Sequence, residues 1–282
     1  MNKPLVKPGN PRTAVVTGAG RGIGRAVAVE LVARGYLVVV TDLDGSAAES
    51  TAAEIGASLG LRIDVTDPEA NRDVAARACE IAPLGAWVCN AGVLAEGDLT
   101  VLSVNQVRSM VDVNVLGVMW GVRAAADTFR GQSGGGVSGG EIGIIASLSA
   151  HAPVPGLSVY AATKAAALSL ATSLATELHP DKVRVHAVCP DGVDTAMVDS
   201  MDPSGGVRAA LAAGVLLTPA QVAHELVEMF GTRRVYRTLP AWRGVIARSA
   251  SLSPVVAMRA DPLLRKIGTR RLRKAGKLDG KH

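Results

Sequence analysis

The segment Thr17–Gly24 reads TGAGRGIG and lies between a β-branched run, Thr13–Thr17, and a segment with helical spacing of apolar residues, Gly22–Arg34. Glycine permits a tight turn and lets the backbone approach a ligand closely. The N–H groups at the start of the following helix would then face an anion such as a pyrophosphate. A strand, a glycine turn and a helix in this order are typical of nucleotide-binding folds.

The alternation of strand and helix continues beyond this segment. Six strands are predicted at Thr13–Thr17, Leu37–Thr41, Leu61–Val65, Trp87–Asn90, Ile142–Ala146 and Arg184–Val188. Helices are predicted at Gly22–Arg34, Gly45–Ile55, Pro68–Glu80, Gln106–Phe129, Ser158–Leu178 and Thr218–Phe230. This order predicts an α/β fold with a Rossmann-like, doubly wound parallel sheet in a single domain.

Charge divides the chain into two parts. Residues 231–282 hold 14 of the 30 Lys and Arg but only 2 of the 25 Asp and Glu, so this part carries about +12 and residues 1–230 about −7. We therefore expect a catalytic domain at residues 12–230 and a basic C-terminal extension at residues 231–282. Met197–Gly214 is expected to be either a lid or an ordinary surface loop.

The cysteine pattern and the first twelve residues indicate where in the cell the protein is located. The three cysteines, Cys79, Cys89 and Cys189, form no CxxC pair, so neither a disulfide framework nor a metal site is expected. The first twelve residues lack the apolar core of a signal peptide. These observations favour a cytoplasmic protein.

One carboxylate indicates which cofactor is bound. Asp42 follows the second predicted strand, eighteen residues beyond Gly24, where a carboxylate can accept both hydroxyls of an adenosine ribose. It would also repel a 2′-phosphate. Arg21 could attract that phosphate, but the residue after Asp42 is Leu43 rather than Arg. The sequence favours NAD over NADP.

Two residues indicate proton-transfer chemistry. Tyr160 and Lys164 stand four apart in YAATK, so both project from one face of the predicted helix. A tyrosine with an ordinary pKa near 10 is a poor base, but a neighbouring ammonium favours its phenolate. Tyr160 is therefore a candidate general acid/base.

These motifs together resemble the short-chain dehydrogenase/reductase family over residues 12–230. Gly18, Gly22 and Gly24 fit the TGxxxGxG pattern of that family, and Tyr160 and Lys164 fit its YxxxK pattern. The resemblance implies an oxidoreductase that moves a hydride between nicotinamide and a secondary alcohol or ketone. It also implies a homodimer or homotetramer formed through the two long helices.

The resemblance extends to two further catalytic residues. Ser147 lies thirteen residues before Tyr160, which is the family spacing for a serine that positions the substrate oxygen. Ser149 is the alternative for this role. Asn114, in VDVNVLG, resembles the asparagine that helps hold a water near the lysine and so supports a proton relay.

Three further segments resemble cofactor contacts of the family. Asp64 and Val65 resemble the adenine contact, and CNAG at 89–92 resembles NNAG with Cys in the first position. PDGVDT at 190–195 resembles PGxVxT, with Asp191 in the glycine position. Asp191 is either accommodated through Gly192 or faces the pocket. The resemblance implies cofactor contacts by Gly18, Arg21, Gly22, Ile23, Gly24, Asp42, Asp64, Val65, Asn90, Ala91, Gly92, Tyr160, Lys164, Pro190, Val193 and Thr195.

The remaining segments indicate a class of substrate, and two alternative functions stay open. We expect the substrate pocket to be built from three loops, Leu94–Asp98, Ala150–Ser158 and Met197–Val215. Their residues are mostly small and apolar, which favours a hydrophobic alcohol or ketone as the substrate. One alternative is a protein that binds NAD as a sensor or scaffold without turnover. Another is an NADP-dependent ketoreductase.

The basic extension has two interpretations. Leu263, Leu264 and Ile267 form a narrow apolar stripe among basic residues, so a helix there could lie on an anionic membrane surface. The alternative is a solvated or packed extension. No aromatic interleaving or reading motif accompanies the charge, so specific nucleic-acid binding is not expected.

Overall fold

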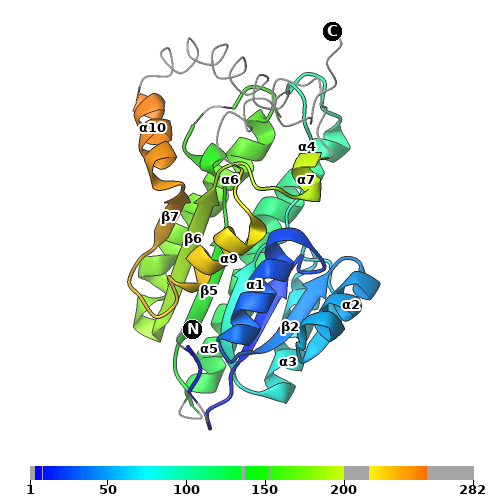
Figure 1. Cartoon of the computed structure of the whole chain (residues 1–282), viewed down its shortest axis with the longest axis vertical. Helices are drawn as coiled ribbons and strands as arrows, with labels where there is room; N and C mark the ends of the chain where they lie inside the picture. The colour runs from blue at the N-terminus through cyan, green and yellow to red at the C-terminus, as the bar shows by residue number, and fades with distance from the viewer. Residues whose placement is uncertain (1–3, 8, 135–136, 153, 200–215, 253–282) are drawn as a thin grey trace.

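A seven-stranded parallel sheet forms the centre of the protein in a computed structural model, with the order β3-β2-β1-β4-β5-β6-β7 (Figure 1). The structure describes residues 4–7, 9–134, 137–152, 154–199 and 216–252. The strands are β1 Thr13–Thr17, β2 Leu37–Asp42, β3 Leu59–Arg62, β4 Leu84–Cys89, β5 Gly140–Ile145, β6 Val183–Pro190 and β7 Tyr236–Leu239. The strand order reverses between β1 and β4, which is the point where doubly wound sheets bind ligands.

Helices cover both faces of the sheet, as the predicted doubly wound fold requires. They are α1 Gly22–Ala33, α2 Gly45–Ile55, α3 Pro68–Ile81, α4 Val104–Val111, α5 Gly117–Ser133, α6 Ser158–Glu177, α7 Ala196–Asp199, α9 Pro219–Val227 and α10 Ala241–Leu252. Helices α1, α2 and α9 share one apolar core with the sheet, and α3, α5 and α6 share the other. Among the described helices, none is long and apolar enough to cross a membrane.

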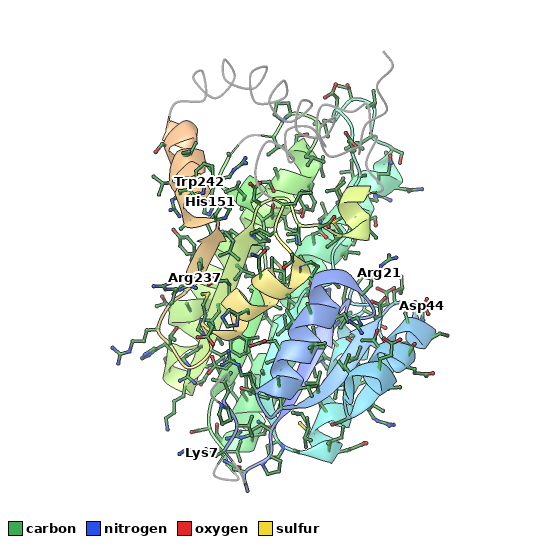
Figure 2. All side chains as sticks on the ribbon, in the orientation of Figure 1. Lys7, Arg21, Asp44, His151, Arg237 and Trp242 are labelled. Carbon is green, nitrogen blue, oxygen red and sulfur yellow. The ribbon has the colours of Figure 1, made fainter. Side chains whose placement is uncertain are left out.

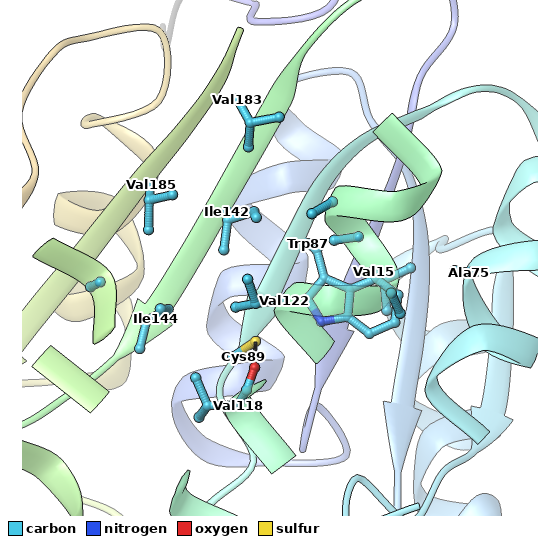
Figure 3. Packing of buried hydrophobic residues seen from close by; sticks show 14 of the residues in the cluster. Val15, Ala75, Trp87, Cys89, Val118, Val122, Ile142, Ile144, Val183 and Val185 are labelled. Carbon is cyan, nitrogen blue, oxygen red and sulfur yellow. Dashed lines mark hydrogen bonds between the residues drawn. The ribbon is translucent and has the colours of Figure 1, made fainter. Parts of the chain in front are cut away.

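The core explains the strand sequences. All five residues of β1, TAVVT, are buried, because a parallel strand covered on both faces has no solvent-facing side. Figure 3 shows Val118 and Val122 of α5 packed over Trp87 and Ile142 of the sheet. This continuous packing holds the carboxyl ends of the central strands in fixed positions.

Three elements differ from the sequence prediction. The sheet has a seventh strand, β7, beyond the predicted six and beyond residue 230, where the catalytic domain was expected to end. Strand β3 is Leu59–Arg62 instead of Leu61–Val65. The single helix predicted at Gln106–Phe129 is interrupted by a π-helical turn, Asp112–Leu116, between α4 and α5. Most of the expected lid and all of the apolar stripe at 263–267 lie outside the described residues.

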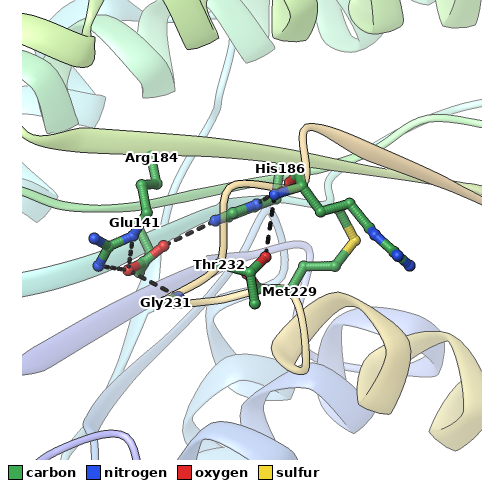
Figure 4. Close-up of polar contacts among 7 residues, drawn as sticks. Glu141, Arg184, His186, Met229, Gly231 and Thr232 are labelled. Carbon is green, nitrogen blue, oxygen red and sulfur yellow. Dashed lines mark hydrogen bonds and ion pairs between the residues drawn. The ribbon is translucent and has the colours of Figure 1, made fainter.

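A buried polar cluster joins β5, β6 and the segment before β7 (Figure 4). Oε2 of Glu141 lies 2.9 Å from Nε2 of His186, and Nδ1 of His186 lies 2.6 Å from the carbonyl oxygen of Arg234. Oε1 of Glu141 accepts hydrogen bonds from Nε of Arg184 at 2.8 Å and from the Gly231 N–H at 3.2 Å. These bonds hold residues 231–234 against the sheet and so set the approach of β7 to β6.

Candidate active site

The glycine turn adopts the backbone that its sequence requires. Gly18 and Gly22 have φ values of +62° and +58°, which side chains with a Cβ rarely adopt. A Cβ on Gly18 would lie 2.8 Å from Cα of Ala91, and a Cβ on Gly24 would lie 2.3 Å from the Gly18 carbonyl oxygen. The turn therefore packs directly on the end of β4 and on the start of α1.

Asn90 ties the end of β4 to this turn. Its Nδ2 donates hydrogen bonds to the carbonyl oxygens of Thr17 and Gly18, both at 2.8 Å. Its backbone N–H donates to Oγ1 of Thr17 at 3.0 Å, and the N–H of Ala91 donates to the same oxygen at 3.1 Å. Thr17 is thus a site residue that the sequence reasoning missed, although its position directly before the first glycine could have indicated it.

The start of α1 fits an anionic group. The Arg21 side chain makes no hydrogen bond that caps the start of α1, and the first N–H groups of a helix are a binding site for anions. Oδ2 of Asp42 accepts a hydrogen bond from the Gly20 N–H at 3.0 Å, which places the carboxylate beside the turn. Figure 2 shows the exposed Arg21 next to this end of α1. An adenosine diphosphate group matches this arrangement of glycines, helix start and carboxylate.

Asp64 is held inside its own turn. Its Oδ1 accepts hydrogen bonds from the backbone N–H and from Oγ1 of Thr66, at 3.0 and 2.7 Å. Val65 is buried against Gly117, where an added Cβ would meet its Cγ2 at 2.8 Å. The structure thus gives both residues contacts within the protein, beside the expected contact with adenine.

Tyr160 and Lys164 lie on the first turns of α6 and meet the end of β5. Nζ of Lys164 donates a hydrogen bond to the Ile145 carbonyl oxygen at 2.8 Å and lies 5.7 Å from the centre of the Tyr160 ring. The lysine is buried, and this burial lowers its pKa to about 8 because a charged amine is poorly solvated there. The pair predicted from YAATK therefore comes together inside the protein.

Ser147 is the serine that faces the tyrosine. Burial raises the pKa of Tyr160 to about 12, and a hydrogen bond with the Ser147 side chain acts in the opposite direction. Oγ of Ser149 donates to Oγ of Ser147 at 2.9 Å. Ser149, the alternative in the sequence, stands behind Ser147 and orients it.

Asn114 lies in the π-helical turn and is fully buried. Its Nδ2 donates to the Val93 carbonyl oxygen at 2.8 Å and to Oγ1 of Thr163 at 3.1 Å, while its Oδ1 accepts from the Val93 N–H at 2.9 Å. A Cβ on Gly92 would lie 3.2 Å from Oδ1 of Asn114 and 3.5 Å from Nζ of Lys164. Asn114, Gly92 and Lys164 are therefore immediate neighbours, which is the arrangement expected for a proton relay.

The segment after β6 approaches the glycine turn. Pro190 pairs with Leu239 of β7, and Val193 forms an isolated bridge with Leu217. A Cβ on Gly22 would have Cγ2 of Thr195 as its nearest neighbour, at 3.7 Å. Loop 190–195 and the glycine turn thus face each other across the switch point of the sheet.

The side chain of Asp191 is buried and lies against Arg243. Its Oδ2 lies 2.8 Å from Nε of Arg243, at the start of α10. Arg243 is a second residue that the sequence reasoning missed, because a contact across 52 residues leaves no local signal.

The fold and this site define an α/β oxidoreductase with a dinucleotide-binding cleft. The model of the short chain dehydrogenase family matches residues 12–204. The chain is 32% identical over 238 residues to a 2-(R)-hydroxypropyl-CoM dehydrogenase of Xanthobacter autotrophicus. That alignment covers 80% of this chain and 93% of the relative. It is 34% identical over 193 residues to a sorbitol dehydrogenase of Cereibacter sphaeroides, and this alignment covers 68% of the chain and 74% of the relative.

Solved structures agree with the family match. A short-chain dehydrogenase/reductase from Burkholderia phymatum in complex with NAD has a TM-score of 0.78 at 27% identity, covering 89% of this chain and 97% of that one. A 3-ketoacyl-(acyl-carrier-protein) reductase from Brucella melitensis complexed with NADH has a TM-score of 0.74 at 27% identity, covering 83% and 99%. The chain belongs to the short-chain dehydrogenase family and is an oxidoreductase that acts on alcohol groups.

Proposed function

We propose that this protein is an NAD-dependent dehydrogenase of hydrophobic secondary alcohols, or a reductase of the corresponding ketones. The observation that carries the proposal is the buried contact of Tyr160 with Ser147 and Lys164 at the end of β5. When bound, the nicotinamide cofactor supplies the acceptor or donor of the hydride. The two NAD-bound and NADH-bound neighbours support this cofactor.

Each catalytic side chain has a role that its contacts support. Tyr160 exchanges a proton with the substrate oxygen, and Ser147 holds that oxygen through its hydroxyl while charge develops. The Lys164 ammonium, 5.7 Å from the centre of the Tyr160 ring, favours the phenolate form of Tyr160 by its charge. Asn114 holds the backbone of Val93 next to Lys164 and so keeps the route for the proton in place.

A small apolar cluster beside Tyr160 supports a hydrophobic substrate. Leu94, Val154 and Tyr160 pack on the buried Leu157. Leu94, Val154 and Leu157 come from the loops that the sequence assigned to the substrate pocket, Leu94–Asp98 and Ala150–Ser158. A substrate oxygen bound at Tyr160 would therefore have apolar side chains next to its carbon atoms.

The choice of NAD is tested by Asp42→Ala. The carboxylate of Asp42 stands at the end of β2, where it can accept ribose hydroxyls and would repel a 2′-phosphate. We expect the variant to bind NADH roughly tenfold more weakly and NADPH no more weakly than the wild type. The measurement is the fluorescence titration of both nucleotides, followed by turnover of a panel of hydrophobic alcohols.

Asp44→Ala is the matched control, because this neighbouring carboxylate caps α2 and accepts from Ser46 and Ala47 instead. Equal loss of NADH affinity in both variants would contradict the role given to Asp42. Tight NADH binding by the wild type without turnover of any alcohol would favour the sensor or scaffold.

We further propose that the protein is a cytoplasmic homodimer or homotetramer whose basic extension, 231–282, contacts anionic membranes. Trp242, Val245 and Ile246 lie on one side of α10 and are 59%, 58% and 58% exposed, which supports a surface contact. We expect sedimentation of the protein with phosphatidylserine vesicles but not with phosphatidylcholine vesicles, and loss of sedimentation in Trp242→Ser/Ile246→Ser.

Sedimentation velocity without vesicles measures the oligomeric state. A monomer at micromolar concentration would contradict the proposed homodimer or homotetramer.

A further inference from the structure

Asp191 is a buried carboxylate in a position where the family pattern has glycine. Its side chain is 3% exposed. Burial raises the pKa of Asp191, while Arg243 and the Gly192 N–H act to lower it. Because a buried charge is costly without a partner, these two groups are what make an ionised Asp191 tolerable at this place.

The partner of Asp191 comes from outside the family match, which ends at residue 204. Arg243 belongs to α10, and its side chain is 17% exposed, so the ion pair is largely removed from water. The backbone N–H of Asp191 also donates to the Leu239 carbonyl oxygen at 2.8 Å. Side chain and backbone of Asp191 are thus both held by residues 239–243.

The same part of the chain also meets the catalytic end of β5. Oγ1 of Thr238 lies 3.4 Å from Nε2 of His151, four residues after Ser147. The His151 ring also lies against the Tyr236 ring of β7, with 5.8 Å between the ring centres. Residues 238–243 therefore border the site from the edge of the sheet.

The loop that follows Asp191 leads to the glycine turn. The Leu217 N–H donates to the Gly192 carbonyl oxygen, and the Asp194 N–H donates to the Leu217 carbonyl oxygen, both at 2.9 Å. A Cβ on Gly22 would have Cγ2 of Thr195, at the end of this loop, 3.7 Å away. A displacement of Asp191 would move this loop relative to the glycine turn.

We propose that the ion pair between Asp191 and Arg243 positions loop 192–195 against the bound cofactor, which makes Arg243 a positioning residue for the reaction. This role rests on the proposed function, because it concerns the same nicotinamide cofactor. A glycine at position 191 would leave the loop without a side-chain connection to α10. The pair thus connects the start of α10 to this loop, although Arg243 touches no reacting atom.

A double-mutant cycle tests this role. Arg243→Leu leaves an unpaired carboxylate under the loop, so we expect the dissociation constant of NADH and the KM for NAD to rise roughly tenfold to a hundredfold, with a smaller change in kcat at saturating NAD. In the Asp191→Gly background, Arg243→Leu should have no further effect, because there is no carboxylate left to pair. Arg248→Leu, which removes a cation that stacks on Tyr236 of the same region, is the matched control and should bind NADH like the wild type.

Two outcomes would overturn the proposal: wild-type NADH affinity in Arg243→Leu, or an equal loss in the wild-type and Asp191→Gly backgrounds. If Arg243→Leu does not fold, Asp191→Asn takes its place, since it removes the charge with little change of shape. That variant should show the same rise in KM for NAD, and an unchanged KM would overturn the proposal as well. Absence of NADH binding by the wild type would instead contradict the proposed function.

Discussion

Tyr160→Phe is expected to lower turnover by roughly 10²–10⁴-fold while the affinity for NADH stays close to that of the wild type. The substitution removes one hydroxyl and keeps the ring that packs on Leu157. That hydroxyl is the group in contact with Ser147, so the variant loses the proton donor or acceptor and leaves the apolar pocket intact. The loss should therefore appear in kcat rather than in cofactor binding.

Stopped-flow absorbance at 340 nm with an alcohol that the wild type oxidises measures this effect. Tyr36→Phe is the matched control, because Tyr36 is also buried but lies before β2, at the opposite end of the sheet. A residual rate within a factor of about ten of the wild type would assign the proton transfer to another group.

Lys164→Met should change activity and stability in opposite directions. Burial lowers the pKa of Lys164 from 10.5 to about 8, so the unfolded chain binds the proton more tightly than the folded protein. The free energy of unfolding therefore rises between about pH 8 and 10.5, and below pH 8 the full penalty of about 3 kcal/mol applies. Methionine has no such penalty, although the Ile145 carbonyl oxygen loses its donor.

At pH 7 we expect Lys164→Met to be more stable by roughly 1–3 kcal/mol, which raises the melting temperature by about 2–8 °C. Turnover should fall by roughly two orders of magnitude or more, because Tyr160 loses its ammonium neighbour. Calorimetry at pH 7 and pH 10 measures the effect, and the gain should shrink at the higher pH. Lys182→Met, at an exposed turn, is the control. A lower melting temperature for Lys164→Met at pH 7 would contradict the burial argument.

The local motifs of this chain could be predicted from sequence because their geometry is decided within a few residues. Tyr160 and Lys164 are four residues apart, so they share one face of their helix whatever the position of that helix in the fold. The glycine turn between β1 and α1 likewise follows from backbone freedom at Gly18 and Gly22. The parallel order of strands followed from their alternation with helices, and the structure confirms it.

The remaining features depend on contacts between distant residues. The four residues of β7, YRTL, carry no strong strand pattern, and their pairing with β6 depends on the Glu141 cluster that holds residues 231–234. Strand β3 ends at Arg62 because its partner β2 ends at Asp42, although the apolar Ile63 and Val65 continue the pattern. The partner of Asp191 could not be found from sequence, because only the fold brings α10 to the end of β6.

The π-helical turn at Asp112–Leu116 makes the orientation of Asn114 depend on the exact number of residues between α4 and α5. The Gly117 N–H there bonds to the Asp112 carbonyl oxygen, five residues back, so one residue more than a regular turn is accommodated. Deleting a single residue would restore a regular helix, yet Asn114 or its replacement would point about 100° away from Val93 and Thr163. The fold and the glycine turn would remain. Under the role proposed for Asn114, such a deletion would turn a dehydrogenase into a protein that binds its nucleotide without turnover.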